Sequence, residues 1–117
     1  MSKKNYRQQL GSLGEKIAAQ FYQQRGWKIV QQNYWTRYGE LDLVLQKNNR
    51  ILIVEVKTRN NYNLGYGEET VNQQKLEHLN QAYQIMQKKN KLPENCEIEI
   101  CVIETKNRRA SIKRFLV

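Results

Sequence analysis

Two acidic residues and one lysine that could act together lie in adjacent apolar segments of this 117-residue chain. Asp42 follows Gly-Glu-Leu, whereas Glu55 and Lys57 belong to the later run Ile-Val-Glu-Val-Lys-Thr-Arg. The polar tetrapeptide 47–50, Lys-Asn-Asn-Arg, separates the two segments and predicts a β-hairpin, because asparagine tolerates the left-handed conformations of tight turns. A turn on the two asparagines places Asp42 opposite Glu55 and Glu40 opposite Lys57.

This pairing predicts a metal site suited to phosphodiester hydrolysis. Side chains directly opposite on one face have Cβ atoms about 5 Å apart, and like charges there repel, so Asp42 and Glu55 need a compensating cation. Magnesium prefers one or two carboxylates, with water, backbone carbonyl and phosphate oxygens as its other ligands. Lys57 projects to the same side as Glu55 and could orient an attacking water or offset charge in the transition state. Solvated charges at strand ends are the alternative interpretation.

The other face of the expected hairpin is apolar and should pack against a helix or a core. The same register pairs its residues as Leu41 with Val56, Leu43 with Val54 and Leu45 with Leu52.

A first helix is expected over about residues 6–25, with Gly26 at its C-terminal end. Its apolar stripe comprises Leu10, Leu13, Ile17 and Phe21. Glu15 falls at the edge of this stripe, among small residues that could let the end of a sheet approach. On position alone, a solvated helix carboxylate is the simpler interpretation of Glu15.

A strand over 27–33 leads into an aromatic and basic linker made of Tyr34, Trp35, Arg37 and Tyr38. Aromatic residues interleaved with arginine can stack on bases or grip a nucleic-acid backbone, although packing beside a sheet edge is equally compatible with the pattern. Arg37 is therefore a candidate phosphate contact. Arg59 is a second candidate, because strand alternation places it on the same side as Glu55 and Lys57.

The second half of the chain continues with a polar loop at 60–69 that could close over a substrate. Thr70 and Gln73 form a capping-box pattern for a second helix, and Lys75 borders the apolar stripe of that helix and could point toward the site. The stripe itself consists of Leu76, Leu79, Tyr83 and Met86.

Strands at 97–103 and 110–117 complete the chain. The resulting order is helix, three strands, helix and two strands. It predicts a single α/β domain over residues 1–117, with the central hairpin carrying the site.

The charge balance favours a polyanionic partner. Twenty Lys and Arg against eleven Asp and Glu give a formal net charge of +9. Solvated surface charges could explain any single basic cluster, but together with a carboxylate site they make nucleic acid the leading partner. Membrane binding is disfavoured, because neither helix has a broad apolar face with aromatic anchors.

The cysteines and the lack of a visible targeting signal bear on disulfides, metal sites and cellular location. Cys96 and Cys101 share one expected strand and point to opposite faces, so they should not pair with each other. With a single histidine, a structural zinc site is disfavoured. The polar start and the lack of a long apolar run predict a cytoplasmic protein.

The segments 39–44, Gly-Glu-Leu-Asp-Leu-Val, and 53–59, Ile-Val-Glu-Val-Lys-Thr-Arg, resemble the signature of the YraN-like uncharacterised proteins. These proteins are grouped with the PD-(D/E)XK, restriction-endonuclease-like nucleases and are similar to archaeal Holliday-junction resolvases. The resemblance covers nearly the whole chain. It implies a restriction-endonuclease-like α/β fold with a central mixed five-stranded sheet flanked by helices, and a phosphodiesterase site that uses Mg²⁺ or Mn²⁺.

The resemblance also implies roles for individual residues. Asp42 matches the first acid of the motif, Glu55 the second and Lys57 its lysine, while Leu41 stands where the motif often has proline. Glu15, in Leu-Gly-Glu-Lys, matches the first-helix glutamate that completes the metal site of related nucleases. Because those resolvases act as dimers, the likeness makes a homodimer one option for this chain.

The expected function is therefore that of a metal-dependent endonuclease that hydrolyses DNA, with branched or structured DNA suggested by the resolvase likeness alone. Asp42, Glu55 and Glu15 are the expected metal ligands, and Arg59, Lys75 and Arg37 complete the expected contacts to nucleic acid. Two alternatives remain open. One is a non-catalytic nucleic-acid-binding module on the same fold, and the other is a basic protein-interaction subunit.

Overall fold

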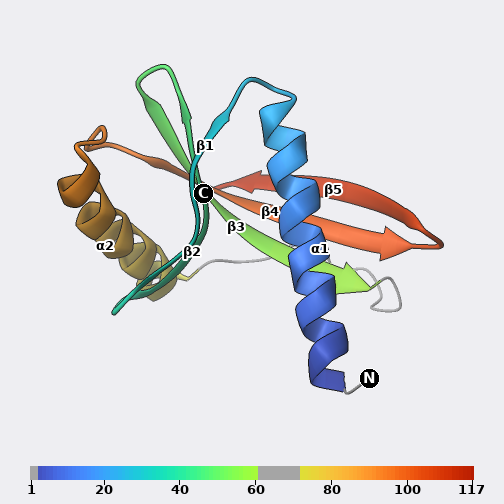
Figure 1. Ribbon diagram of the computed structural model, residues 1–117. Helices are drawn as coiled ribbons and strands as arrows, with labels where there is room; N and C mark the ends of the chain where they lie inside the picture. Colours follow the sequence, from blue (N-terminus) through green and yellow to red (C-terminus); the bar gives the residue numbers. More distant parts are fainter. Residues whose placement is uncertain (1–2, 61–71) are drawn as a thin grey trace.

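The computed structural model describes residues 3–60 and 72–117, which form a mixed five-stranded sheet with one helix on each face (Figure 1). The strands lie in the order β1-β2-β3-β4-β5, so the sheet follows the sequence. The elements are α1 (Lys3–Gln23), β1 (Lys28–Thr36), β2 (Gly39–Lys47), β3 (Arg50–Asn60), α2 (Gln73–Asn90), β4 (Glu97–Lys106) and β5 (Arg109–Leu116). This confirms the expected α/β class and element order.

The directions of the strands follow from their connections. Strands β1, β2 and β3 are joined by short turns and pair antiparallel, as do β4 and β5. Strands β3 and β4 pair parallel, because the chain between them passes through α2. Asn48, in the turn between β2 and β3, has a φ of 56°, the left-handed conformation for which asparagine is suited.

The expected register of the central hairpin is confirmed from Lys47↔Arg50 to Leu43↔Val54. Beyond that point the prediction that Leu41 pairs with Val56 is wrong. Leu41 packs into the core beneath α2, whereas Val56 packs on the α1 side. Leu41 and Leu43 therefore lie on opposite faces, although residues two apart in a strand normally share one. Strand β2 thus loses its regular alternation at Asp42.

Helix α1 covers one face of the sheet with two alanines and a tyrosine. Ala18, Ala19 and Tyr22 are buried against β2, β3 and β4, while Leu13, which was expected in the core stripe, is 48% exposed. Gly14 makes this orientation possible, because a Cβ on it would overlap the side chain of Thr58 in β3. The buried face of the helix is therefore the one that carries Gly14 and the two alanines, and Glu15 lies next to it.

Helix α2 covers the other face as expected, through Leu79, Tyr83 and Met86 with Leu76 beside them. Its N-cap is Asn72, whose side chain accepts a hydrogen bond of 2.8 Å from the Lys75 backbone nitrogen. The helix therefore begins later than the capping box expected from Thr70, which lies outside the described residues.

Strand β1 is longer than expected and takes up part of the predicted linker. Tyr34 and Trp35 belong to the strand, and Arg37 and Tyr38 form the turn into β2. Tyr34 and Tyr38 are partly buried and pack against the core beneath α2, as the packing interpretation of these aromatics required. Trp35 is 72% exposed, so that interpretation does not hold for Trp35.

The two cysteines are free, and they pack on opposite sides of the sheet as predicted, Cys101 toward α1 and Cys96 toward α2. The expectation that both lie in one strand is wrong, because β4 begins at Glu97, directly after Cys96. Neither helix, over the part of the chain that the structure describes, is long and apolar enough to cross a membrane.

Candidate active site

The candidate site lies where β2 and β3 separate. Their ladder ends at Leu43↔Val54, and Figure 1 shows the two strands diverging beyond it. Asp42 occupies this fork. Its Oδ2 accepts a hydrogen bond of 2.8 Å from the backbone nitrogen of Val56, so a side chain takes the place of a backbone partner. The carboxyl is thereby held next to β3, although the strands have begun to part.

Glu55 lies on the α2 side of the fork and is only 7% exposed. Its Oε1 lies 3.5 Å from Nζ of Lys75 in α2 and 3.6 Å from Nζ of Lys57. Its Oε2 is buried and, within the described ranges, accepts no hydrogen bond. Two ammonium groups therefore share one oxygen of Glu55, and the second oxygen is left without the partner that a buried carboxylate normally has.

The electrostatic environment of Asp42 opposes its ionisation. Burial, the charge of Glu55 and a hydrogen bond with Glu40 together raise the pKa of its carboxyl to about 8, against the lowering effect of the Val56 N–H. Asp42 therefore holds a proton near neutral pH unless a cation approaches. A group with such a pKa inside a fork of the sheet is a candidate for function.

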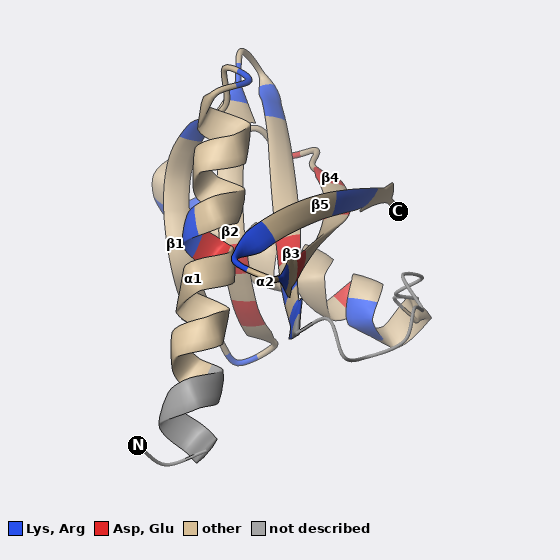
Figure 2. Cartoon of the chain, turned by 90° about the vertical axis from the view of Figure 1, so that its right-hand side faces the viewer, with Lys and Arg blue, Asp and Glu red and all other residues tan. Residues whose placement is uncertain are grey.

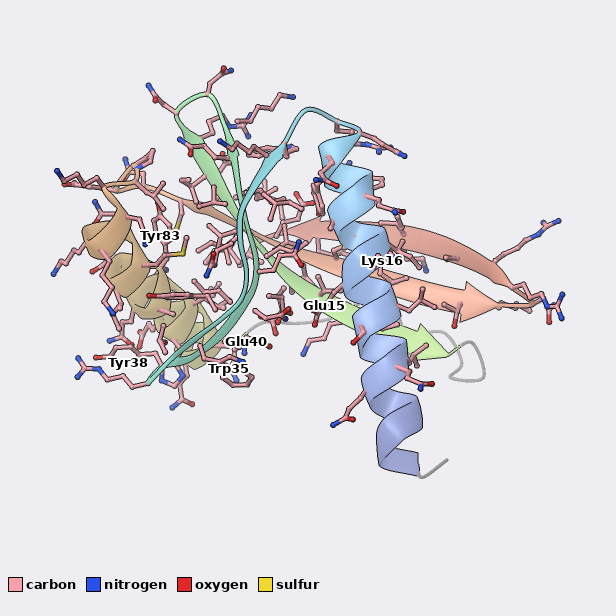
Figure 3. The ribbon with its side chains drawn as sticks, in the orientation of Figure 1. Glu15, Lys16, Trp35, Tyr38, Glu40 and Tyr83 are labelled. Carbon is pink, nitrogen blue, oxygen red and sulfur yellow. The ribbon has the colours of Figure 1, made fainter. Side chains whose placement is uncertain are left out.

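A second pair of carboxylates approaches Asp42 from the α1 side. The side-chain amide of Asn33 donates to Oε2 of Glu15 at 2.8 Å and to Oε2 of Glu40 at 3.2 Å. Figure 3 labels Glu15 and Glu40, which come from α1 and β2 toward each other. Asn33 has a φ of 50° within β1, a left-handed conformation that is unusual for a strand residue.

The acidic residues therefore run through the fork from one face of the sheet to the other. Glu15 and Glu40 lie on the α1 side, Asp42 lies between the strands, and Glu55 lies on the α2 side with its two lysines. In Figure 2 red segments of α1, β2 and β3 occupy the middle of the view. This arrangement brings together side chains from α1 and from the β2–β3 hairpin, which are separate parts of the sequence.

Most of the residues expected at the site lie there. Glu15, Asp42, Glu55, Lys57 and Lys75 all border the fork, and the expectation that Lys75 points toward it is confirmed by its contact with Glu55.

The two arginines lie further out. Arg59 follows on β3 with its backbone carbonyl accepting from Thr105, and Arg37 lies in the β1–β2 turn, its guanidinium 5.0 Å from the centre of the Tyr38 ring.

Sequence reasoning did not assign Asn33 or Glu40 to the site. Glu40 had been paired with Lys57 on the assumption of a continuous ladder, whereas its partner across the strands is Trp35 in β1. The motif Gly-Glu-x-Asp could have pointed to Glu40. Nothing in the local sequence marks Asn33, because its role depends on the approach of α1.

The donors in the fork fit a hard divalent cation. Within residues 3–60 and 72–117 no three His, Cys, Asp or Glu side chains lie ready to enclose a metal ion. Magnesium needs only one or two carboxylates, because water and other oxygens complete its coordination. The unpartnered oxygen of Glu55 and the neighbouring Asp42 carboxyl supply that number. A cation beside them would favour the ionised form of Asp42 and so lower its raised pKa.

Comparison with known proteins places the chain among relatives whose names state no activity. A UPF0102 protein of Syntrophomonas wolfei is 47% identical over 74 residues, which are 63% of this chain and 64% of that protein. UPF0102 protein TTE1452 of Caldanaerobacter subterraneus is 43% identical over 69% of each chain, and a UPF0102 protein of Caldicellulosiruptor saccharolyticus is 32% identical over 84% of this chain and 82% of its own. The first match thus spans less than two thirds of the relative's length.

The family model covers more of the chain than the pairwise match to the Syntrophomonas protein. It matches residues 14–105, a range that runs from Gly14 at the helix–sheet contact, through the fork, to the penultimate residue of β4. This chain therefore belongs to the uncharacterised protein family UPF0102.

Proposed function

We propose that this protein is a Mg²⁺-dependent endonuclease that hydrolyses phosphodiester bonds in DNA. The observation that carries the proposal is the buried carboxylate of Glu55, which has one oxygen unpartnered among the described residues and the other shared by two lysines, beside Asp42 with its raised pKa. Acidic ligands next to cationic side chains suit a reaction in which a metal and a phosphate meet. The likeness to PD-(D/E)XK nucleases supports the same assignment.

Each residue of the fork has a role in the proposal. Asp42 and Glu55, together with the Val56 carbonyl, hold the metal, and Glu15 contributes from α1 directly or through water. When bound, Mg²⁺ lowers the pKa of a coordinated water and neutralises charge on the scissile phosphate. Lys57 Nζ orients the attacking water or stabilises the charge that develops on the phosphate oxygens.

Asn33 acts through the carboxylates and not on the substrate. By donating to Glu15 and Glu40 at once, its amide keeps two negative groups close enough to serve one site. Groups that orient metal ligands in this way commonly affect metal affinity by about 10- to 100-fold.

The basic side chains around the fork supply the attraction to DNA. Lys75 Nζ lies 3.5 Å from Oε1 of Glu55, so its positive charge is available to a phosphate that approaches the fork. Arg59, further along β3, and Arg37, in the turn between β1 and β2, are the additional phosphate contacts of the proposal. Together with the net charge of +9, these groups predict binding that weakens steeply with salt.

The test is cleavage of labelled single-stranded, duplex and four-way-junction DNA with Mg²⁺ or Mn²⁺. Wild type is compared with Glu55→Gln and Lys57→Ala, and with Glu94→Gln, which changes an exposed carboxylate outside the fork. We expect cleavage that requires metal, survives in Glu94→Gln and is lost in the other two variants. Calorimetric titration with Mn²⁺ provides a second readout, which Glu55→Gln should weaken and Lys57→Ala should not.

Two results would reject the assignment. Equal cleavage by all four proteins would identify a contaminating nuclease. Absence of both cleavage and Mn²⁺ binding, with salt-dependent DNA binding intact, would instead identify a non-catalytic nucleic-acid-binding module.

A further inference from the structure

Trp35 is an exposed aromatic residue at the edge of the acidic fork. Its side chain is 72% exposed, although indole rings are usually well covered in folded proteins. The neighbouring aromatics of the same hairpin, Tyr34 and Tyr38, are partly buried and pack against the α2-side core. The hairpin therefore partly covers two of its three aromatic rings and leaves the largest one in solvent.

The position of Trp35 relative to the fork follows from the strand register. Trp35 pairs directly with Glu40 across β1 and β2, so the two side chains share one face of the hairpin. Glu40 in turn is held by Asn33 together with Glu15. Figure 3 labels Trp35 and Glu40 at the same end of the hairpin, on the side toward α1. The indole thus borders the carboxylates without contributing to the core.

We propose that Trp35 stacks on an unpaired nucleobase of the DNA strand whose phosphate is bound at the fork. This inference rests on the proposed function and specifies the substrate class. An indole ring offers a flat apolar face, and stacking on it is sequence-tolerant because every base has a π-face. In a continuous duplex the neighbouring bases cover those faces, so Trp35 can stack only where the strand is single, frayed or displaced.

Charge alone would give no such preference. The surplus of lysine and arginine attracts any nucleic acid through its phosphates, and such contacts carry no information about base pairing. An exposed aromatic ring beside the site adds a term that only unpaired bases can satisfy. Trp35 is therefore a determinant of specificity for strand structure.

The test measures binding in EDTA, so that neither cleavage nor metal affinity enters the result. A labelled oligothymidylate and a hairpin duplex of equal length are titrated with wild type, Trp35→Ala and Trp35→Phe, followed by fluorescence anisotropy. Leu116→Ala serves as the matched control, because Leu116 is also a large apolar residue, 70% exposed, at the end of β5. Circular dichroism verifies that each variant is folded.

We expect Trp35→Ala to weaken oligothymidylate binding by roughly 5- to 150-fold, the range found when a stacking aromatic is removed. Duplex binding should change less than about twofold, Trp35→Phe should recover part of the loss, and Leu116→Ala should match wild type. In addition, the single-indole variant Trp27→Phe should show quenched emission on binding oligothymidylate, and Trp35→Phe should not.

Three outcomes overturn the inference in distinguishable ways. Unchanged oligothymidylate binding in Trp35→Ala would mean that the indole serves another purpose, such as docking a protein. An equal loss for single strand and duplex would mean a general role without specificity for unpaired bases. Failure of the wild type to bind either DNA at low salt would reject the proposed nucleic-acid partner together with this inference.

Discussion

The substitution Asp42→Asn should stabilise the metal-free protein and abolish the proposed metal binding. The carboxyl of Asp42 has its pKa raised from 3.8 to about 8 by burial, by the charge of Glu55 and by Glu40. An asparagine is neutral at every pH, has nearly the same shape and can still accept the Val56 N–H through its amide oxygen. The variant therefore removes the electrostatic cost and keeps the hydrogen bond.

The sign and size of the effect follow from proton linkage. Between about pH 4 and pH 8 the folded carboxyl keeps its proton whereas the unfolded one has lost it, so the free energy of unfolding falls as pH rises through this window. Below the window both states are protonated, and above it both are ionised. A difference of about 4 pKa units corresponds to an upper limit on the order of 5 kcal/mol, and relaxation around the ionised group would leave a few kcal/mol.

The assay is urea unfolding in EDTA at several values between pH 4 and pH 9, for wild type, Asp42→Asn and the control Glu94→Gln. The difference between Asp42→Asn and wild type should be near zero at pH 4 and should grow to a few kcal/mol in favour of the variant at pH 8. Other titrating groups cancel in this difference. Added Mg²⁺ should then stabilise the wild type at pH 8 and leave Asp42→Asn unchanged.

A difference that stays flat across the window would refute the assignment of a raised pKa to Asp42. A difference of opposite sign, with Asp42→Asn less stable at pH 8, would show that Asp42 is ionised and favourably paired in the folded protein. In that case the carboxylate would already be neutralised by lysines, and the argument for a cation in the fork would lose its electrostatic basis.

Three further expectations concern the residues that hold the fork together. Asn33→Gly, in which glycine tolerates the left-handed backbone, should keep nearly wild-type stability but bind Mn²⁺ about 10- to 100-fold more weakly by calorimetry. Asn33→Ala should be less stable than Asn33→Gly by roughly 1 kcal/mol in urea unfolding. Unchanged Mn²⁺ affinity in both variants would show that Asn33 does not position the carboxylates. Gly14→Ala should lower stability by about 1–3 kcal/mol because its Cβ meets Thr58, and Thr58→Ala should recover part of that loss in the double variant; simple additivity would contradict the contact. Mg²⁺ should raise the thermal midpoint of wild type but not of Glu55→Gln, and an equal rise in both would place the ion elsewhere.

Much of the fold could be read from local patterns because those patterns report burial directly. The hairpin register from Leu43 to Lys47 follows from alternation and from the asparagine turn, and both were correct. The core stripe of α2 follows from helical spacing, since long apolar side chains there have only one buried direction. Both features are determined by residues that are close together in the sequence, so the sequence pattern was sufficient to predict them.

The errors arose where long-range contacts override local patterns. Leu13 was assigned to the core because it is large and regularly spaced, yet with the close approach of α1 at Gly14 the buried residues are Ala18, Ala19 and Tyr22. Leu41 was assigned to one face by alternation, but the separation of β2 from β3 turns it to the other. The bridge made by Asn33 depends on both events, since Glu15 reaches it from α1 and Glu40 from β2.

The fork also explains how a folded sheet can hold this much negative charge in one place. Had the ladder between β2 and β3 continued, Val56 N–H would have been satisfied by a backbone carbonyl, and the Asp42 side chain would have pointed away from β3. Because the strands separate, the Val56 N–H donates to the Asp42 carboxylate instead. Asp42 thereby lies near Glu55 although the two residues are not paired in the ladder. The loss of ladder hydrogen bonds and the raised pKa of Asp42 both reduce stability, while neither improves the two cores. Such local costs are typical of binding sites, where a ligand restores what the empty arrangement lacks.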